Sequence, residues 1–434
     1  MAGEAFIDCT VGDLAAQTRN ALVGGPFGSD LVSKDYVPTG VPVIRGTNMG
    51  HGRWVDGEFA YVTPEKAESL SSNCAKPGDI VFTQRGTLGQ VALVPKKGME
   101  KYLISQSQMK LTVNAEKADA VFLYYVFSSA EQQHYIRQNA IQTGVPHTNL
   151  GILRNTPLTL PPLAEQKANA SVLGALDDKI ELNRRMNATL EAMARALFQS
   201  WFVDFDPVRA KLDGRPPAGL DKATAALFPD HLEVSPLGHI PKGWTAGKLG
   251  DIGTNLRRGV QPNEIAPNTP YIALEHMPRR SIALGDWDES ADVASGKSAF
   301  KKGEILFGKL RPYFHKVGVA PFDGVCSTDI LVLSPKSPEW FGFLLSHASS
   351  DALIQFTDLA STGTKMPRTN WSDISSFKVA LPPKAIAAAF TKLIQPMLDR
   401  LHANLHQSRT LATLRDTLLP KLLSGELSVA NLEN

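Results

Sequence analysis

The sequence predicts a mixed α/β (α+β) fold, in which two globular domains are joined by two long antiparallel coiled-coil helices with internal pseudo-two-fold symmetry. Residues 144–197 recur at 363–418, and this period is too long for a solenoid repeat, so it indicates a duplicated half. Each copy runs from a proline pair into a stretch whose apolar residues are spaced by three and four. The remaining sequence alternates short apolar runs with turn residues, as small strands do.

The two copies align with one slip at a glycine and then keep a constant offset of 221 positions. The matched positions are Thr148-Asn149 with Thr369-Asn370, Leu160-Pro161-Pro162 with Leu381-Pro382-Pro383, and Asp178 with Asp399. A duplicated chain offers its partner two similar surfaces. A double-stranded DNA site with two parts is the partner that this arrangement suggests.

Residues 1–160 and 241–383 are the two predicted globular domains. In the first, apolar runs predict strands at 41–46, 78–83 and 91–95, and the pattern at 119–138 predicts a helical stretch. The second domain repeats this scheme loosely, with similar runs at 271–277 and 303–307 and a helical patch at 338–356. We therefore expect two mixed domains whose sequences have diverged more than the helices have.

Residues 161–200 and 384–425 are the two predicted helices, and proline suits the first turn because its missing N–H has no helical partner there. The seam positions of a coiled coil recur at intervals of three and four in both. In the first helix they are Leu173, Leu176, Ile180, Asn183, Asn187, Leu190, Ala194 and Leu197. In the second they are Ile394, Met397, Leu401, Asn404, Ser408, Leu411, Arg415 and Leu418. Both copies are polar at the two central positions, and only Arg415 departs from the pattern.

The polar centre of the seam predicts the orientation of the pair. In an antiparallel arrangement Asn183 meets Ser408 and Asn187 meets Asn404, so that polar side chains face each other. The alternative is that each amphipathic helix packs only on its own domain. The 25 residues from Leu173 to Leu197 span about 37 Å at 1.5 Å per residue. DNA half-sites one turn apart are separated by about 34–36 Å, so the pair has the length of a spacer.

Residues 201–240 are interpreted as a linker between the first helix and the second domain, and residues 426–434 as a tail. The linker begins with the aromatic run Trp201-Phe202-Val203-Asp204-Phe205 and continues into a segment rich in proline and glycine. Its aromatic residues are expected to hold it against the folded domains.

The composition is that of a globular protein, with 43% hydrophobic and 20% charged residues among 434. The three cysteines are far apart in the sequence, which favours a reducing compartment over disulfides or a zinc site. The first residues lack the features of a signal peptide, and no apolar run is as long as a membrane-spanning helix. We therefore expect a cytoplasmic protein with no membrane partner.

The charge of the two domains is close to neutral. Residues 1–160 carry 14 basic and 14 acidic side chains, and residues 241–383 carry 16 and 14. A domain that binds DNA unaided is usually strongly basic. If this chain binds DNA, either its cations are clustered on one face or a partner supplies part of the phosphate contact.

The order of these segments resembles the specificity subunit of type I restriction-modification enzymes, over almost the whole chain. The resemblance is carried by the helix entry Leu-Pro-Pro-Leu-Ala-Glu-Gln at 160–166, the exit Trp-Phe-Val-Asp-Phe-Asp-Pro at 201–207 and the opening Leu-Gly-His-Ile-Pro-Lys-Gly-Trp at 237–244. One departure is the second helix entry, Pro-Pro-Lys-Ala-Ile at 382–386, where the family more often has Pro-Pro-Leu-Ala-Glu-Gln.

The resemblance implies two target-recognition domains, each reading one part of a split, asymmetric site in double-stranded DNA, with the helices as spacer. It also implies that two modification subunits dock on those helices and methylate adenine with S-adenosylmethionine. Restriction subunits, which are motor-nucleases using ATP and Mg²⁺, join them for cleavage. The chain itself would then bind no cofactor and no metal.

No catalytic motif was found in the sequence. Adenine methyltransferases carry an Asn/Asp-Pro-Pro-aromatic motif, but the proline pairs here follow Leu160, Arg215 and Leu381. No GxGxxG follows a predicted strand, and Ser295-Gly-Lys-Ser298 has Ala291 where a phosphate-binding loop needs its first glycine. We expect a non-catalytic subunit. The alternatives are a protein–protein scaffold that binds no DNA, which the neutral charge permits, and a single-chain methyltransferase or nuclease.

The candidate DNA contacts combine loops shared by both copies with polar residues specific to one copy, because arginine, asparagine and glutamine bind base edges and phosphates. In the first domain they are Arg45, Asn48, Arg53, Gln84, Arg85, His147 and Asn149. In the second they are Arg257, Arg258, His276, Arg279, Arg280, Lys309, Arg311, Arg368 and Asn370.

Overall fold

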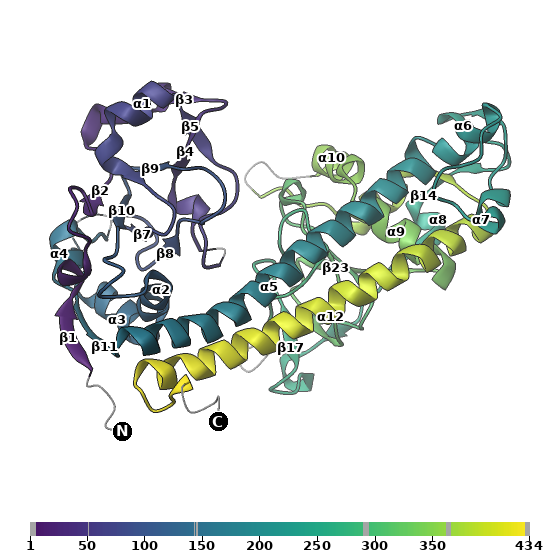
Figure 1. Ribbon diagram of the computed structural model, residues 1–434. Helices are drawn as coiled ribbons and strands as arrows, with labels where there is room; N and C mark the ends of the chain where they lie inside the picture. Colours follow the sequence, from purple (N-terminus) through teal and green to yellow (C-terminus); the bar gives the residue numbers. More distant parts are fainter. Residues whose placement is uncertain are drawn as a thin grey trace. The chain divides into compact units, whose positions relative to one another are not determined.

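The computed structural model describes residues 6–50, 52–142, 144, 146–289, 295–361 and 366–429. It divides into two compact units, Met1–Glu181 with Thr410–Asn434, and Leu182–Arg409. Each unit holds one globular domain and the part of the helix pair on which that domain packs (Figure 1).

The described residues of the first unit form three sheets. The antiparallel pair β1 (Ile7–Thr10) and β11 (Pro157–Leu160) joins the start of the domain to its end. The four-stranded sheet has the order β2 (Leu22–Gly24), β10 (Gln108–Leu111), β7 (Ile80–Thr83), β8 (Val91–Leu93). The five-stranded sheet has the order β3 (Tyr36–Val37), β5 (Ala60–Val62), β4 (Val41–Ile44), β9 (Tyr102–Ile104), β6 (Cys74–Ala75). Strands β4, β7 and β8 lie in the three runs predicted as strands.

The short α-helices described in this domain are α1 (Pro64–Ser69), α2 (Ala120–Ser128), α3 (Ala130–Gln138) and α4 (Leu150–Arg154). The helical stretch expected at 119–138 is two helices rather than one. Ser129 lies in extended backbone between them, and its hydroxyl accepts from the Gln132 N–H at 3.3 Å, which caps α3.

The second unit repeats this architecture. Its end strands are β14 (Thr245–Lys248) and β24 (Lys378–Leu381). Its four-stranded sheet has the order β15 (Gly253–Asn255), β23 (Ile330–Pro335), β20 (Ile305–Gly308), β21 (Val317–Val319). Its five-stranded sheet has the order β16 (Gly259–Val260), β19 (Lys297–Phe300), β22 (Gly324–Cys326), β17 (Pro270–Ile272), β18 (Asp288–Glu289). Its helices are α8 (Leu249–Ile252), α9 (Phe341–Ala348), α10 (Asp351–Ala360) and α11 (Trp371–Ser376).

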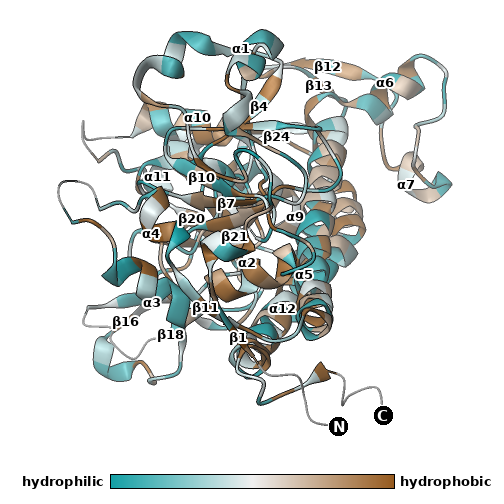
Figure 2. Cartoon of the chain, turned by 60° about the vertical axis from the view of Figure 1, so that its left-hand side comes forward, coloured by the Kyte–Doolittle hydropathy of each residue, from teal (hydrophilic) through white to brown (hydrophobic). Residues whose placement is uncertain are grey.

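The correspondence extends to strand direction. Strand β17 pairs parallel with β22, as β4 pairs parallel with β9, and the neighbouring pairs are antiparallel in both sheets. The sheets differ at one edge strand, which is β3 in the first unit and β16 in the second. Strands β7 and β20, which the sequence matched to each other, are buried along their whole length and appear mainly in hydrophobic colour in Figure 2. The predicted duplication of a mixed domain is confirmed.

The two long helices are α5 (Leu163–Phe198) and α12 (Lys384–Leu423), so the atypical entry at 382–386 still starts a helix. In the second unit, the Asn183 amide donates to the Ser408 hydroxyl at 3.2 Å, and the Asn404 amide donates to the Asn187 oxygen at 2.8 Å. As the residue number rises along α5, the residue number of its partner on α12 falls, so the helices are antiparallel. Their register is the one predicted from the polar centre of the seam. The alternative of helices that pack only on their own domains is wrong.

The same direction holds in the first unit, where the Asn169 amide donates to the Leu422 carbonyl at 3.2 Å. Every predicted seam residue is buried or half-buried. Arg415, which breaks the apolar pattern, forms an ion pair with Asp177 at 2.7 Å. The departure is therefore a paired charge rather than a defect in the seam.

The segment 201–240 contains regular structure of its own. A π-helical turn (Gln199–Val203) leads to α6 (Asp206–Leu212) and α7 (Lys222–Ala226), followed by the hairpin β12 (Leu232–Ser235) and β13 (Gly238–Pro241). Trp201 and Phe202 are 2% and 5% exposed and belong to the main core of the second unit. The aromatic run thus packs the segment against its own unit.

Candidate nucleic-acid interface

A depression of about 490 Å³ in the first domain lies beside the ends of β4 and β7 and beside the turn that precedes β10. It is lined by Arg45 after β4, Arg85 and Thr87 after β7, and Thr47 and Gln106. Arg85 and Thr87 are exposed. The side chains offer one or more hydrogen-bond donors each, which suits phosphates and base edges.

A depression of about 660 Å³ in the second domain is lined by Arg257, Lys309, Arg368 and Asn370, four of the predicted residues. Lys309 is the first residue after β20, and Arg85 is the second residue after the matching strand β7. Asp329 lies 4.0 Å from the Lys309 ammonium and 3.5 Å from the Arg368 guanidinium. Two cations thus share one carboxylate, and Arg257 adds a third, so basic charge is concentrated here although the domain is almost neutral overall.

The two depressions occupy corresponding places in the two domains. In the first, a β-bridge joins Arg85 to His147, and in the second a β-bridge joins Leu310 to Arg368. His147 and Arg368 are matched positions of the two copies. The duplicated scaffold therefore places different side chains around the same kind of surface.

Asn149 and Asn370 have a structural role that explains why both copies share them. The Asn149 side-chain oxygen accepts from the Ile152 N–H at 2.9 Å and caps α4. The Asn370 oxygen accepts from the Ser372 N–H at 2.8 Å and caps α11. Each carbonyl oxygen is thus already used within the fold, and the caps hold the neighbouring loops in place.

Three predicted contacts are corrected, because their side chains are buried within the fold. Asn48 is 0% exposed and its amide donates to the backbone carbonyls of Asp56 and Glu58. Arg53 and His276 are 7% and 8% exposed. The His276 Nδ1 accepts from the Ala273 N–H, and Arg53 contacts α5. A side chain bound in this way is not available to DNA.

Other predicted residues lie outside the two depressions. The Arg258 guanidinium donates to both carboxylate oxygens of Glu304 at 2.8 Å, and this contact raises the pKa of Arg258. The Arg279 guanidinium stacks on the Phe314 ring. Arg280 pairs with Asp351 at 2.9 Å in a separate cleft. Gln84 and Arg311 do not line either depression.

Sequence reasoning missed several lining residues, notably Thr47, Gln106, Gln261 and Lys297. In the sequence, Lys297 stood out only as part of an apparent phosphate-binding motif. It begins β19, and its ammonium donates to the Ser295 hydroxyl and carbonyl at 2.8 and 3.0 Å. The segment is thus a turn that leads into a strand, and Ala291 lies outside the described residues.

Metal binding and membrane insertion find no support in the described residues. Within that part of the chain, histidine, cysteine, aspartate and glutamate side chains form no cluster of three or more able to hold a metal ion. Among its helices, none has the length and apolar character needed to cross a membrane.

Residues 33–192 and 241–414 match the family described as the type I restriction modification DNA specificity domain. The two matched segments together cover most of the chain. The chain belongs to this family. The resemblance inferred from the helix entries and exits is therefore confirmed, and so is the expected function in DNA sequence specificity. Members of this family are specificity subunits, and catalysis is carried by other subunits of the complex.

Curated relatives match nearly end to end. The chain is 25% identical over 426 residues to the type I restriction enzyme MjaIX specificity subunit of Methanocaldococcus jannaschii, covering 95% of this chain and 92% of the relative. It is 31% identical over 408 residues to the putative MjaX specificity subunit of the same organism, covering 92% and 89%. The HindI specificity subunit of Haemophilus influenzae is 26% identical, covering 81% of this chain and 87% of the relative.

The fold is also similar to a solved structure. The crystal structure of a type I restriction-modification S subunit from M. genitalium matches with a TM-score of 0.56 and 16% identity, covering 97% of this chain and 96% of the other. The predicted fold class, two mixed domains joined by two long antiparallel helices, is confirmed.

Proposed function

We propose that this specificity subunit reads a split, asymmetric site in double-stranded DNA, one part in each domain. The observation that carries the proposal is the pair of corresponding depressions with different linings. The first presents Arg45, Arg85 and Thr87, and the second presents Arg257, Lys309 and Arg368. Similar scaffolds with different side chains suit two different base sequences.

The chemistry of each lining supports this assignment. Arginine binds guanine through two hydrogen bonds in the major groove, and lysine and threonine bind phosphates or base edges. The basic residues are too few for strong binding by charge alone. The proposal therefore gives part of the phosphate contact to partner subunits.

Arg85→Ala and Lys309→Ala test the division of labour between the domains. We expect each substitution to weaken discrimination at one part of the site by about 1–3 kcal/mol, roughly tenfold to a hundredfold, and to leave the other part unchanged. The measurement is methylation of competing plasmids, each with one altered base pair, by the complex with its modification subunits. Lys101→Ala, which removes an exposed ion pair with Glu68, is the control. Equal effects of one substitution on both parts would contradict the proposal.

We also propose that two modification subunits bind the helix pair and that restriction subunits join the assembly. Met193 on α5 and Leu414 on α12 support a repeated partner surface. They are matched positions of the two copies, and they are 48% and 45% exposed in their respective units. An apolar side chain exposed at the same place in both copies suits one partner that binds twice.

Met193→Asp and Leu414→Asp test this stoichiometry. Each single substitution is expected to lower the mass of the assembly by one modification subunit, and the double substitution by two, because a buried unpaired charge opposes docking. Native mass spectrometry measures the masses. Leu359→Asp, at an apolar residue of α10 that is 89% exposed, is the control and should retain both subunits. Two bound subunits in either single variant would argue against the surface.

The remaining parts of the proposal concern cofactors and location. S-adenosylmethionine, ATP and Mg²⁺ are assigned to the partner subunits. A cytoplasmic location is supported by the three cysteines, all of which are free thiols, with Cys74 and Cys326 buried.

A further inference from the structure

The first domain is bonded to α5 through a buried arginine. The Arg53 side chain is 6% exposed, and its guanidinium donates to the Tyr125 hydroxyl at 3.3 Å and to the carboxylate of Asp178, a 66% exposed side chain, at 2.5 Å. The Arg53 side chain leaves no room for a side chain at position 174 of α5, because a Cβ at Gly174 would lie 2.6 Å from the Arg53 Nη1. Gly174 on the helix and Arg53 on the domain therefore fit each other closely.

The contact continues from the domain to both long helices. The Tyr125 hydroxyl donates to one Asp177 oxygen at 2.6 Å, and the Arg415 guanidinium of α12 donates to the other at 2.7 Å. Burial and the charge of Asp177 raise the pKa of Tyr125, so the phenol keeps its proton and remains a donor. Arg53, Tyr125, Asp177, Asp178 and Arg415 form what we call the first anchor.

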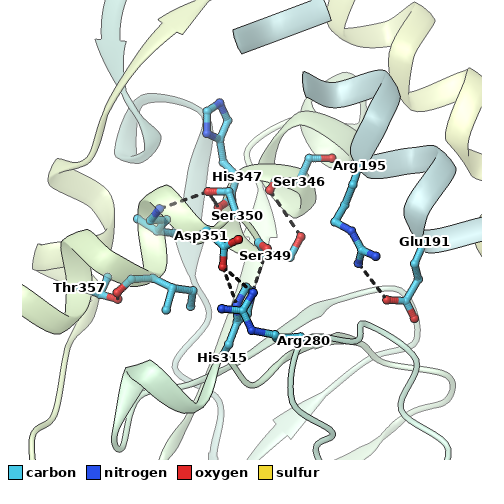
Figure 3. A network of polar contacts seen from close by, with 12 residues as sticks. Glu191, Arg195, Arg280, His315, Ser346, His347, Ser349, Ser350, Asp351 and Thr357 are labelled. Carbon is cyan, nitrogen blue, oxygen red and sulfur yellow. Dashed lines mark hydrogen bonds and ion pairs between the residues drawn. The ribbon is translucent and has the colours of Figure 1, made fainter. Parts of the chain in front are cut away.

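The second domain is bonded to α5 by different residues. The Glu191 side chain is 4% exposed, and its carboxylate accepts from the Ser281 hydroxyl at 2.6 Å and the Ile282 N–H at 3.1 Å. The Arg195 guanidinium lies 3.5 Å from the same carboxylate (Figure 3). Glu191, Arg195, Ser281 and Ile282 form the second anchor.

Most of the anchor residues on α5 are specific to one copy, although Asp178 matches Asp399. The positions that match Asp177 and Glu191 in the second copy are Leu398 and Ala412, which carry no charge. Each domain therefore has its own polar attachment to the helix pair, although the fold and the apolar seam are shared. The divergence of the anchors parallels the divergence of the depressions.

We propose that the two anchors hold each recognition domain at one rotation on the helix pair and thereby set the gap between the two parts of the DNA site. The residues involved are positioning residues, and the inference rests on the proposed function. Apolar contacts such as those of Leu173 and Leu422 tolerate sliding and small rotations, because they have no direction. Charge-assisted hydrogen bonds are strong only over a narrow range of angles. Polar contacts at the domain–helix junction thus select one orientation.

Arg53→Met tests the first anchor in the full complex with its modification subunits. Methionine retains an apolar side chain but leaves Asp178 without its cation. We expect methylation at the native gap to persist, and the preference for that gap over neighbouring gaps to fall about tenfold, because two directional hydrogen bonds of the guanidinium are lost. The measurement uses plasmids in which both parts of the site are kept and the gap is lengthened or shortened by single base pairs. Arg53→Lys, which keeps the charge, should restore part of the preference.

Tyr125→Phe covers the case in which Arg53→Met does not assemble, since it removes one hydroxyl without creating a large cavity. We expect a smaller loss of gap preference, about threefold. The matched control is Lys66→Met, which breaks a half-buried ion pair with Asp35 at 3.3 Å within the same domain and away from α5.

A wild-type gap preference in assembled Tyr125→Phe and Arg53→Met complexes would overturn the proposal, and so would an equal loss of preference in Lys66→Met. Failure of the proposed function has a different signature. In that case the wild-type complex itself would methylate without regard to the two parts of the site.

Discussion

A four-residue insertion in α5 alone, after Ile180, is expected to abolish methylation at the native site. The insertion moves the following residues by about 6 Å and about 40° around the helix. It therefore separates Asn183 from Ser408 and Asn187 from Asn404, and these buried amides lose the hydrogen-bond partners that they have in the native register. The measurement is methylation of the native plasmid by the assembled complex.

A paired insertion is the control for this result. Four residues after Ile180 and four after Thr410 keep the seam in register while lengthening both helices. We expect activity to return at a gap about two base pairs longer, because base pairs rise about 3.4 Å each. Unchanged activity at the native gap in both variants would contradict the role of the helices as a spacer.

Phe390→Ala is expected to destabilise the second unit by about 3–5 kcal/mol. Phe390 is 0% exposed, and its ring centroid lies 4.9 Å from that of Phe202 and 5.6 Å from that of Trp201. Alanine leaves a cavity between α12 and the aromatic turn that ends α5. Denaturant unfolding of the isolated chain, followed by tryptophan fluorescence, measures the change.

Leu393→Ala, three residues further along α12, is the matched control. Leu393 is 39% exposed, so its loss should change the free energy of unfolding by less than about 1 kcal/mol. A loss below about 1 kcal/mol for Phe390→Ala would mean that the aromatic cluster does not hold the segment 201–240 in place.

The helix pair could be predicted from the sequence because its signal is periodic. Seam residues recur every three or four positions, and polar interruptions at Asn183 and Asn404 mark the register by themselves. The strands of the two domains were predictable in the same way, from short apolar runs. The break at Ser129 was missed because one capping hydroxyl, rather than a change of pattern, separates α2 from α3.

The candidate site was only partly predictable. Selecting residues specific to one copy found Arg257 and Arg45 but also Arg53 and His276, which are buried. Whether a charged side chain faces solvent depends on partners far away in the sequence, as Asp178 is from Arg53. Lining residues such as Gln106 are brought to the depression by loops that are far apart in the sequence, so no local sequence pattern predicts them.

The most direct test of the central claim is base-resolution mapping of methylated adenines in DNA treated with the chain and its modification subunits. The account predicts methylation only at a split sequence with two unlike parts, separated by one fixed gap. Exchanging the domain 241–383 for that of another specificity subunit should change one part and leave the other part and the gap unchanged. Methylation at a continuous site, or a change in both parts after the exchange, would contradict the claim that two separate domains read the DNA.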